Sequence, residues 1–120
     1  MDLAAKLQIK AGASVAVVGL PDAVDLGLPE TLTLVEDPAA ADAVVAFVRD
    51  AAAVDAVAGP ALDAARDDRL AWLAYPKAGQ LGTDLSRDSL ARLCEERGAR
   101  PVRQVSIDGV WSALRFRPGA

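Results

Sequence analysis

The side chains best suited to bind a ligand gather between residues 75 and 88. This segment holds two cations, Lys77 and Arg87, together with several hydroxyl groups. It follows an apolar run of strand length and leads into a predicted helix, whose free N–H groups and dipole attract anions. Because open α/β sheets bind ligands at the carboxyl ends of their strands, we expect Lys77 and Arg87 to point into the crevice above the first and third strands. The candidate site for a phosphate or carboxylate comprises Arg49, Tyr75, Lys77, Thr83, Ser86 and Arg87.

The same segment also allows a purely structural interpretation. Lys77 could pair with Asp84, and Asp88 with Arg92, which lies four residues further along the predicted helix. Ser86 suits the N-cap of that helix, and the glycines of the loop suit turns. Two acids in the loop would oppose a bound anion, so the ligand site and the structural loop both stay open.

The C-terminal segment is a second candidate because it is basic. Residues 97–120 carry five arginines and one acid, a net charge of +4, whereas residues 1–96 have a net charge of −8. The dipeptide Asp108-Gly109 is a strong signal for a hairpin with a two-residue turn. Such a turn would place Val105 and Ile107 on the same, buried face as Leu114 and Phe116. The opposite face is a candidate interaction surface made of Gln104, Trp111, Arg115 and Arg117.

This basic face could stack a nucleic-acid base or meet acids of a protein. Thirteen basic and seventeen acidic residues give a net charge of −4, which makes a nucleic-acid partner unlikely. We therefore expect either ordinary packing of Trp111 or self-association, with the hairpin of one subunit near an acidic surface of its mate.

Composition excludes most catalytic and metal-binding chemistry. The 120 residues include no histidine, which removes histidine-based triads and zinc sites that need imidazole. The single cysteine, Cys94, lies on the apolar stripe of a predicted helix and is expected to be core. No serine stands in a G-x-S-x-G turn. Asp84 and Asp88 are one helical turn apart and could share a proton, but they are a weak candidate for acid–base catalysis. We expect no metal and no cofactor, and the sequence favours a non-enzymatic protein while leaving an enzyme open.

A dinucleotide site is also not expected. The turn after the first strand contains one glycine, Gly19, followed closely by Pro21, instead of G-x-G-x-x-G. Glu36 occupies the position of a ribose-binding acid, but without the glycines a solvated acid beside a turn explains it better. The N-terminus has no signal core and no apolar run approaches 18 residues, so we expect a soluble cytoplasmic protein.

Apolar patterning predicts strands in residues 14–18, 31–35, 43–48 and 70–75, with 31–35 at an edge and an irregular crossover in 22–29. Asp2, Asp50 and Ser86 are predicted helix caps, and Gly59-Pro60 should kink or divide the helix after Asp50. Alternating strands and helices predict one α/β domain over residues 1–120. We expect a three-layer Rossmann-like fold with strand order 2-1-3-4, its mostly parallel sheet extended by the antiparallel hairpin. An α+β fold, with a mixed sheet open on one face, is the alternative.

Three segments carry a resemblance to a known family. They are Tyr75-Pro76-Lys77, the run from Thr83 to Asp88, and the closing run from Ser106 to Phe116, which contains Trp111-Ser112-Ala113-Leu114-Arg115. Over residues 12–117 the chain resembles a bacterial family of small proteins that is described as a domain of unknown function. The resemblance implies a domain that spans the whole chain, and it brings no activity, cofactor or site residue. A non-enzymatic binding or interaction protein is therefore expected. The alternative is a small-anion or nucleotide-phosphate binder, enzymatic or not, that uses the loop after the fourth strand.

Overall fold

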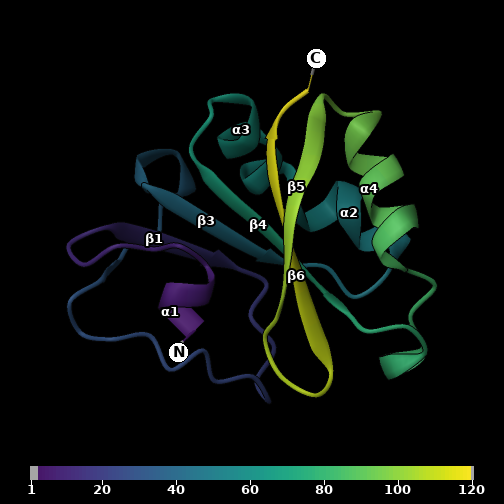
Figure 1. Cartoon of the computed structure of the whole chain (residues 1–120), viewed down its shortest axis with the longest axis horizontal. Helices are drawn as coiled ribbons and strands as arrows, with labels where there is room; N and C mark the ends of the chain where they lie inside the picture. The colour runs from purple at the N-terminus through teal and green to yellow at the C-terminus, as the bar shows by residue number, and fades with distance from the viewer. Residues whose placement is uncertain (1–2, 120) are drawn as a thin grey trace.

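A β-sheet of mixed direction runs through the molecule (Figure 1). The structure is a computed structural model, and it describes residues 3–119. Its strands are β1 (Ser14–Val18), β2 (Thr33–Leu34), β3 (Ala43–Phe47), β4 (Leu70–Pro76), β5 (Ala99–Ser106) and β6 (Trp111–Pro118). They lie in the order β2-β1-β3-β4-β6-β5, with the first four parallel and the last two antiparallel to their neighbours. The predicted α/β class, the order 2-1-3-4 and the attached hairpin are confirmed.

The central strands form from the apolar runs. All of β3 is buried, and so is β4 after its first residue, because both strands have other elements packed on both of their faces. β2 is shorter than the predicted 31–35 and both of its residues are exposed, in keeping with the predicted edge position. The chain then leaves the sheet at Asp37, whose carboxylate caps the short 3-10 helix η1 (Pro38–Ala40).

Three helices cover one face of the sheet: α2 (Ala51–Val57), α3 (Gly59–Arg66) and α4 (Arg87–Glu95). Asp50 caps α2 by accepting the N–H of Ala53, and Pro60 at the start of α3 divides the predicted helix in two. The side chains of Leu62, Leu90 and Leu114 meet in the resulting core.

The other face is covered by one short helix and by irregular chain. The helix is α1 (Leu3–Lys6), and its predicted cap, Asp2, lies outside the described residues. Residues 19–32 run across the sheet without forming a helix, and they bury Val24, Leu26 and Leu32 against it. The indole N–H of Trp72 donates to the Leu7 carbonyl at 2.9 Å, which fastens the end of this layer to β4.

The hairpin register differs from the predicted one. Ser106 lies opposite Ser112 and Gln104 opposite Leu114, so the turn is wider than Asp108-Gly109. The Asp108 carboxylate accepts the N–H groups of Val110 and Trp111, each at 2.8 Å, and Gly109 does not adopt the positive φ that a two-residue turn of this type needs. The assignment of faces was therefore wrong for β5: Val105 and Ile107 share the face of Trp111, not that of Leu114 and Phe116.

β6 lies between β4 and β5, so β5 is the strand of the hairpin that forms the sheet edge. Leu114 and Phe116 are fully buried under the helices, whereas Val105 and Ile107 are only partly buried on the other face.

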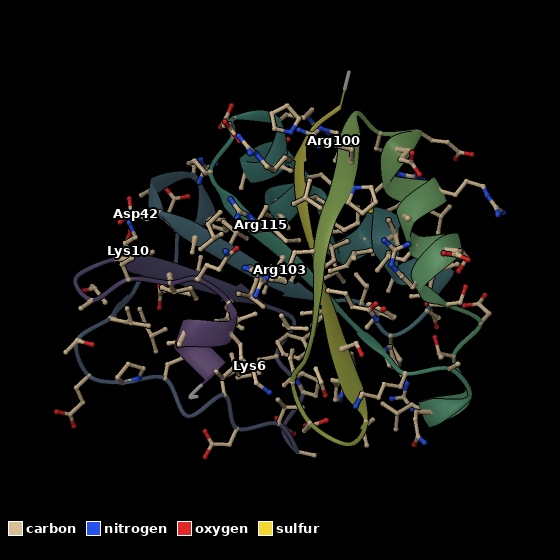
Figure 2. All side chains as sticks on the ribbon, viewed as in Figure 1. Lys6, Lys10, Asp42, Arg100, Arg103 and Arg115 are labelled. Carbon is tan, nitrogen blue, oxygen red and sulfur yellow. The ribbon has the colours of Figure 1, made fainter. Side chains whose placement is uncertain are left out.

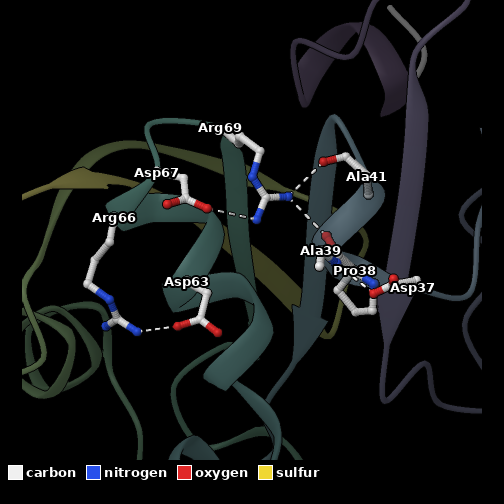
Figure 3. Close-up of polar contacts among 8 residues, drawn as sticks. All are labelled: Asp37, Pro38, Ala39, Ala41, Asp63, Arg66, Asp67 and Arg69. Carbon is white, nitrogen blue, oxygen red and sulfur yellow. Dashed lines mark hydrogen bonds and ion pairs between the residues drawn. The ribbon is translucent and has the colours of Figure 1, made fainter.

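The Arg69 side chain links the start of β4 to η1 at the amino-terminal end of the sheet (Figure 3). Arg69, just before β4, donates to the carbonyl oxygens of Pro38 and Ala41 at 2.9 and 2.7 Å, and it pairs with Asp67 at 3.3 Å. These contacts hold η1 against the start of β4. They lie at the end of the sheet opposite the predicted ligand site, so their role is structural.

Replacing Phe116 with alanine should lower the free energy of unfolding by about 3–5 kcal/mol, because the ring is fully buried and its loss leaves a cavity. Urea denaturation measures the change. Val102→Ala is the matched control, since Val102 is exposed at the irregularity of β5, and we expect it to change stability by less than about 0.5 kcal/mol. Equal losses in the two variants would contradict the burial argument.

Candidate functional site

A hollow of about 340 Å³ opens at the carboxyl end of β4, on the helix side of the sheet. It lies between the end of β4, the start of α4 and the ends of β5 and β6 that lead into the hairpin turn. Its lining residues are Tyr75, Lys77, Ala78, Ser86, Arg87, Gln104 and Ser112. Four of the six predicted ligand-binding residues meet here.

Local capping places the start of α4 at this hollow. The Ser86 hydroxyl accepts the N–H of Ser89 at 3.2 Å, and the Ser89 hydroxyl accepts the N–H of Ser86 at 2.8 Å, which makes a reciprocal capping box. Leu85 and Leu90 are both buried around this first turn, in the positions of a hydrophobic staple. The helix therefore begins at a fixed point, and Arg87 in its first turn reaches the hollow.

A buried phenol forms the floor of the hollow. Tyr75 is 2% exposed, and its hydroxyl accepts a hydrogen bond from the Gln104 amide at 2.9 Å. Burial raises the pKa of Tyr75, outweighing the opposing effects of Arg87 and of hydrogen bonds with Gln104 and Ser112. The phenol thus keeps its proton at neutral pH and remains a possible donor to a ligand.

Two cations stand at the rim. Lys77 donates to the Ser106 hydroxyl at 2.9 Å, and Arg87 lies 3.3 Å from the exposed carboxylate of Asp88. The ion pair Lys77–Asp84 considered from the sequence does not form. Asp84 instead accepts the N–H of Ala51 at 2.9 Å. No carboxylate is among the lining residues. The arrangement suits an anion, because every polar side chain in the lining has a hydrogen-bond donor.

Two predicted residues lie elsewhere. The Thr83 hydroxyl accepts the N–H of Leu85 at 3.0 Å and shapes the loop. Arg49 lines a different hollow of about 500 Å³ on the α1 side, together with Gly19, Phe47 and Trp111. The crevice above β1 and β3 is this second hollow, so the expected direction of Lys77 and Arg87 was wrong. They lie instead above β4, β5 and β6.

Gln104 and Ser112 were not predicted as ligand-binding residues. Gln104 had been assigned to the hairpin face of Trp111, and Ser112 carries no motif of its own. The alternation of side chains along β6 could have indicated Ser112. Trp111 and Ala113 face one side of the sheet, so Ser112 between them faces the other. Only the true register places Gln104 on the side of Ser112.

The predicted interaction face does not exist as a single surface. Gln104 points to the helix side, and Trp111 is 4% exposed, with its ring edge-on to Phe47 at 5.2 Å between ring centres. Trp111 is therefore core, which was the alternative considered from the sequence. Arg115 and Arg117 do share a face, and they remain partly exposed.

Cys94 is fully buried in the helix-side core, as predicted. Burial raises the pKa of its thiol from 9.0 to about 12, which leaves the thiolate inaccessible at neutral pH. Within residues 3–119 no cluster of acidic, cysteine or histidine side chains could hold a metal ion.

Comparison with known proteins gives no family assignment: no protein-family model matches the chain, and no curated protein matches its sequence. Among the helices of residues 3–119, none has the length and apolar character needed to cross a membrane.

Cys94 should make the protein less stable at alkaline pH. The unfolded thiol loses its proton above pH 9, whereas the folded thiol keeps it up to about pH 12, so this contribution is complete below pH 9 and is lost as pH rises toward 12. Between these values the free energy of unfolding should fall more steeply in the wild type than in Cys94→Ala, by up to about 1.4 kcal/mol per pH unit. Urea denaturation at several pH values measures both slopes, and equal slopes would contradict the assignment.

Proposed function

We propose that the protein is a non-enzymatic binding protein, and that it holds a small anion in the hollow at the carboxyl end of β4. The single observation that supports this most is the chemistry of the lining. Lys77 and Arg87 bring positive charge, the other polar side chains bring donors, and none of the lining residues is an acid. A site with this composition favours phosphate or carboxylate over a cation or a neutral ligand.

The size and shape of the hollow favour a compact ligand. A volume of about 340 Å³ lies at the lower end of the range for small-molecule sites. The one aromatic residue of the lining, Tyr75, is 2% exposed and offers no open ring face on which a nucleotide base could stack. We therefore favour inorganic phosphate, a phosphate monoester or a small carboxylate over a whole nucleotide.

The same residues argue for binding without catalysis. A general base needs a group that is unprotonated near neutral pH. The lining contains neither a carboxylate nor a histidine, and the raised pKa of Tyr75 keeps its phenol protonated. Such a site binds and orients an anion but has no group to remove a proton from it.

The fold and the resemblance agree with this proposal. We infer that the sheet is a Rossmann-like variant whose third layer is reduced to α1 and residues 19–32, and the order β2-β1-β3-β4 supports that inference. The three segments that resemble the bacterial family all reach the hollow, through Tyr75 and Lys77, through Arg87, and through Ser112. Membership of that family is part of the proposal.

Phosphate should stabilise the wild type, and the double variant Lys77→Ala/Arg87→Ala should lose this effect. At a hundredfold excess of phosphate over its Kd the gain is about 2.7 kcal/mol, or a rise in Tm on the order of 10 °C. Without phosphate the double variant should melt near the wild type, because Arg87 is exposed and the half-buried Lys77 loses one side-chain hydrogen bond, to Ser106. Thermal unfolding in phosphate and in chloride at equal ionic strength measures the difference.

Arg92→Ala is the control, since Arg92 lies on the exposed face of α4 and does not line the hollow. It should keep the full effect of phosphate. An absence of stabilisation in the wild type, or an undiminished effect in the double variant, would refute the proposed function.

A further inference from the structure

Four arginines lie together on the side of the sheet that faces away from α2, α3 and α4. Two come from β5 and two from β6, and the register places Arg103 directly opposite Arg115 and Arg100 directly opposite Arg117. We call Arg100, Arg103, Arg115 and Arg117 the arginine ladder. Figure 2 shows Arg100, Arg103 and Arg115 along the hairpin, with Lys6 of α1 further along the same side.

This arrangement is electrostatically unfavourable for the isolated protein. Like charges that lie directly opposite each other on neighbouring strands destabilise the sheet. Within residues 3–119, only one carboxylate forms an ion pair with any of the four guanidinium groups: Asp68 accepts two hydrogen bonds from Arg117, at 3.0 and 3.1 Å. Asp68 is the left-handed residue, with φ of 58°, that ends α3: its N–H donates to the Ala65 carbonyl at 3.0 Å.

The remaining three arginines have neutral partners or none. Arg100 donates to the Pro118 carbonyl at 3.1 Å, and Arg115 donates to the Gln8 side chain at 2.7 Å. No hydrogen bond or ion pair joins the Arg103 side chain to another of residues 3–119. The Nε group of Arg115 is buried without a hydrogen-bond partner, and burial lowers the pKa of Arg115, with Arg117 and Arg103 adding to this effect.

Protection of the sheet edge does not explain the ladder. Edge strands often carry charges, prolines and irregularities that prevent them from pairing with other molecules. β5 is the edge strand, and it already has Pro101 and a register shift between Pro101 and Arg103. Arg115 and Arg117, however, belong to β6, which is paired on both sides and has no free edge to protect.

We propose that the arginine ladder binds an extended acidic segment of a partner protein. The two rungs are two residues apart along β6, or about 6.8 Å, which is also the distance between alternate side chains of an extended peptide. Aspartate or glutamate at alternate positions would therefore meet successive rungs and form charge-assisted hydrogen bonds with the guanidinium groups. This surface lies on the opposite side of the sheet from the anion hollow, and its function is independent of it.

Other partners fit the surface less well. Single-stranded nucleic acid is normally bound by exposed aromatic rings, and both aromatic residues of β6, Trp111 and Phe116, are buried. The net charge of −4 also opposes a nucleic-acid partner. A symmetric pair of subunits centred on the ladder would bring arginine against arginine.

Binding can be tested with a fluorescently labelled oligo-glutamate peptide and an oligo-glutamine peptide of equal length. We expect the wild type to bind the glutamate peptide only, with an affinity that falls as salt is added. Arg103→Gln/Arg115→Gln should weaken this binding at least about tenfold, a loss of about 1.4 kcal/mol. Arg92→Gln, which removes an exposed arginine of α4, should leave it unchanged.

Equal binding of the two peptides, or no loss in the double variant, would overturn the proposal. Tighter binding of a single-stranded oligonucleotide than of the glutamate peptide, or ladder-dependent self-association in sedimentation, would overturn the choice of partner. The phosphate response of the hollow should be the same in the ladder variants and the wild type, which separates a failure of this proposal from a failure of the proposed function.

Stability gives a second readout that does not depend on a ligand. Arg103→Gln should raise the Tm in the absence of peptide, because it removes repulsion with Arg115 and breaks no side-chain hydrogen bond or ion pair within residues 3–119. Arg92→Gln should leave the Tm unchanged. A lower Tm for Arg103→Gln would show that the ladder stabilises the hairpin, and would overturn the interpretation of the ladder as a binding surface.

Discussion

The burial of β4 on both faces is the constraint on which the rest of the structure depends. The strand pairs in parallel with β3 and antiparallel with β6, so it joins the two halves of the sheet. Trp72 faces the layer of α1 and Leu73 faces the helices, which links both cores to one strand. At its carboxyl end the backbone N–H of Lys77 donates to the Val110 carbonyl at 2.7 Å. The packing of β4 thus fixes the hollow and the hairpin turn relative to each other.

The turn at Asp108 then decides what each face of the hairpin carries. A register shift of one residue moves every side chain of β5 to the other face of the sheet. With the wide turn that the Asp108 carboxylate stabilises, Gln104 faces Tyr75 in the hollow and Arg103 faces Arg115 on the opposite side. The hollow at the end of β4 and the arginine ladder are therefore two consequences of the same local hydrogen bonds.

The features that the sequence predicted correctly are those set by nearby residues. The apolar strands, the caps at Asp50 and Ser86, and the division of the helix at Pro60 each depend on a few neighbours in the chain. The register of the hairpin was not predictable from Asp108-Gly109. The Asp108 carboxylate accepts the N–H groups of Val110 and Trp111, and these hydrogen bonds stabilise a wider turn than the dipeptide predicts. Four predicted residues reach the hollow because they lie in or beside one loop. Arg49 does not, since it follows Phe47 by two residues and shares its face toward α1.

The distribution of arginines along the sequence does not by itself give their distribution on the surface of the fold. The C-terminal segment has five arginines, but Arg97 turns toward the helix side and pairs with Asp55 at 2.8 Å. The other four converge because β5 and β6 are antiparallel and because the irregularity between Pro101 and Arg103 brings Arg100 and Arg103 onto one face. In a disordered basic tail the arginines would move independently, whereas this hairpin holds them at fixed positions on two paired strands. Because the strands are fixed, the arginines cannot move apart to reduce their repulsion in the folded protein. An acidic partner would likewise meet a surface that is already ordered.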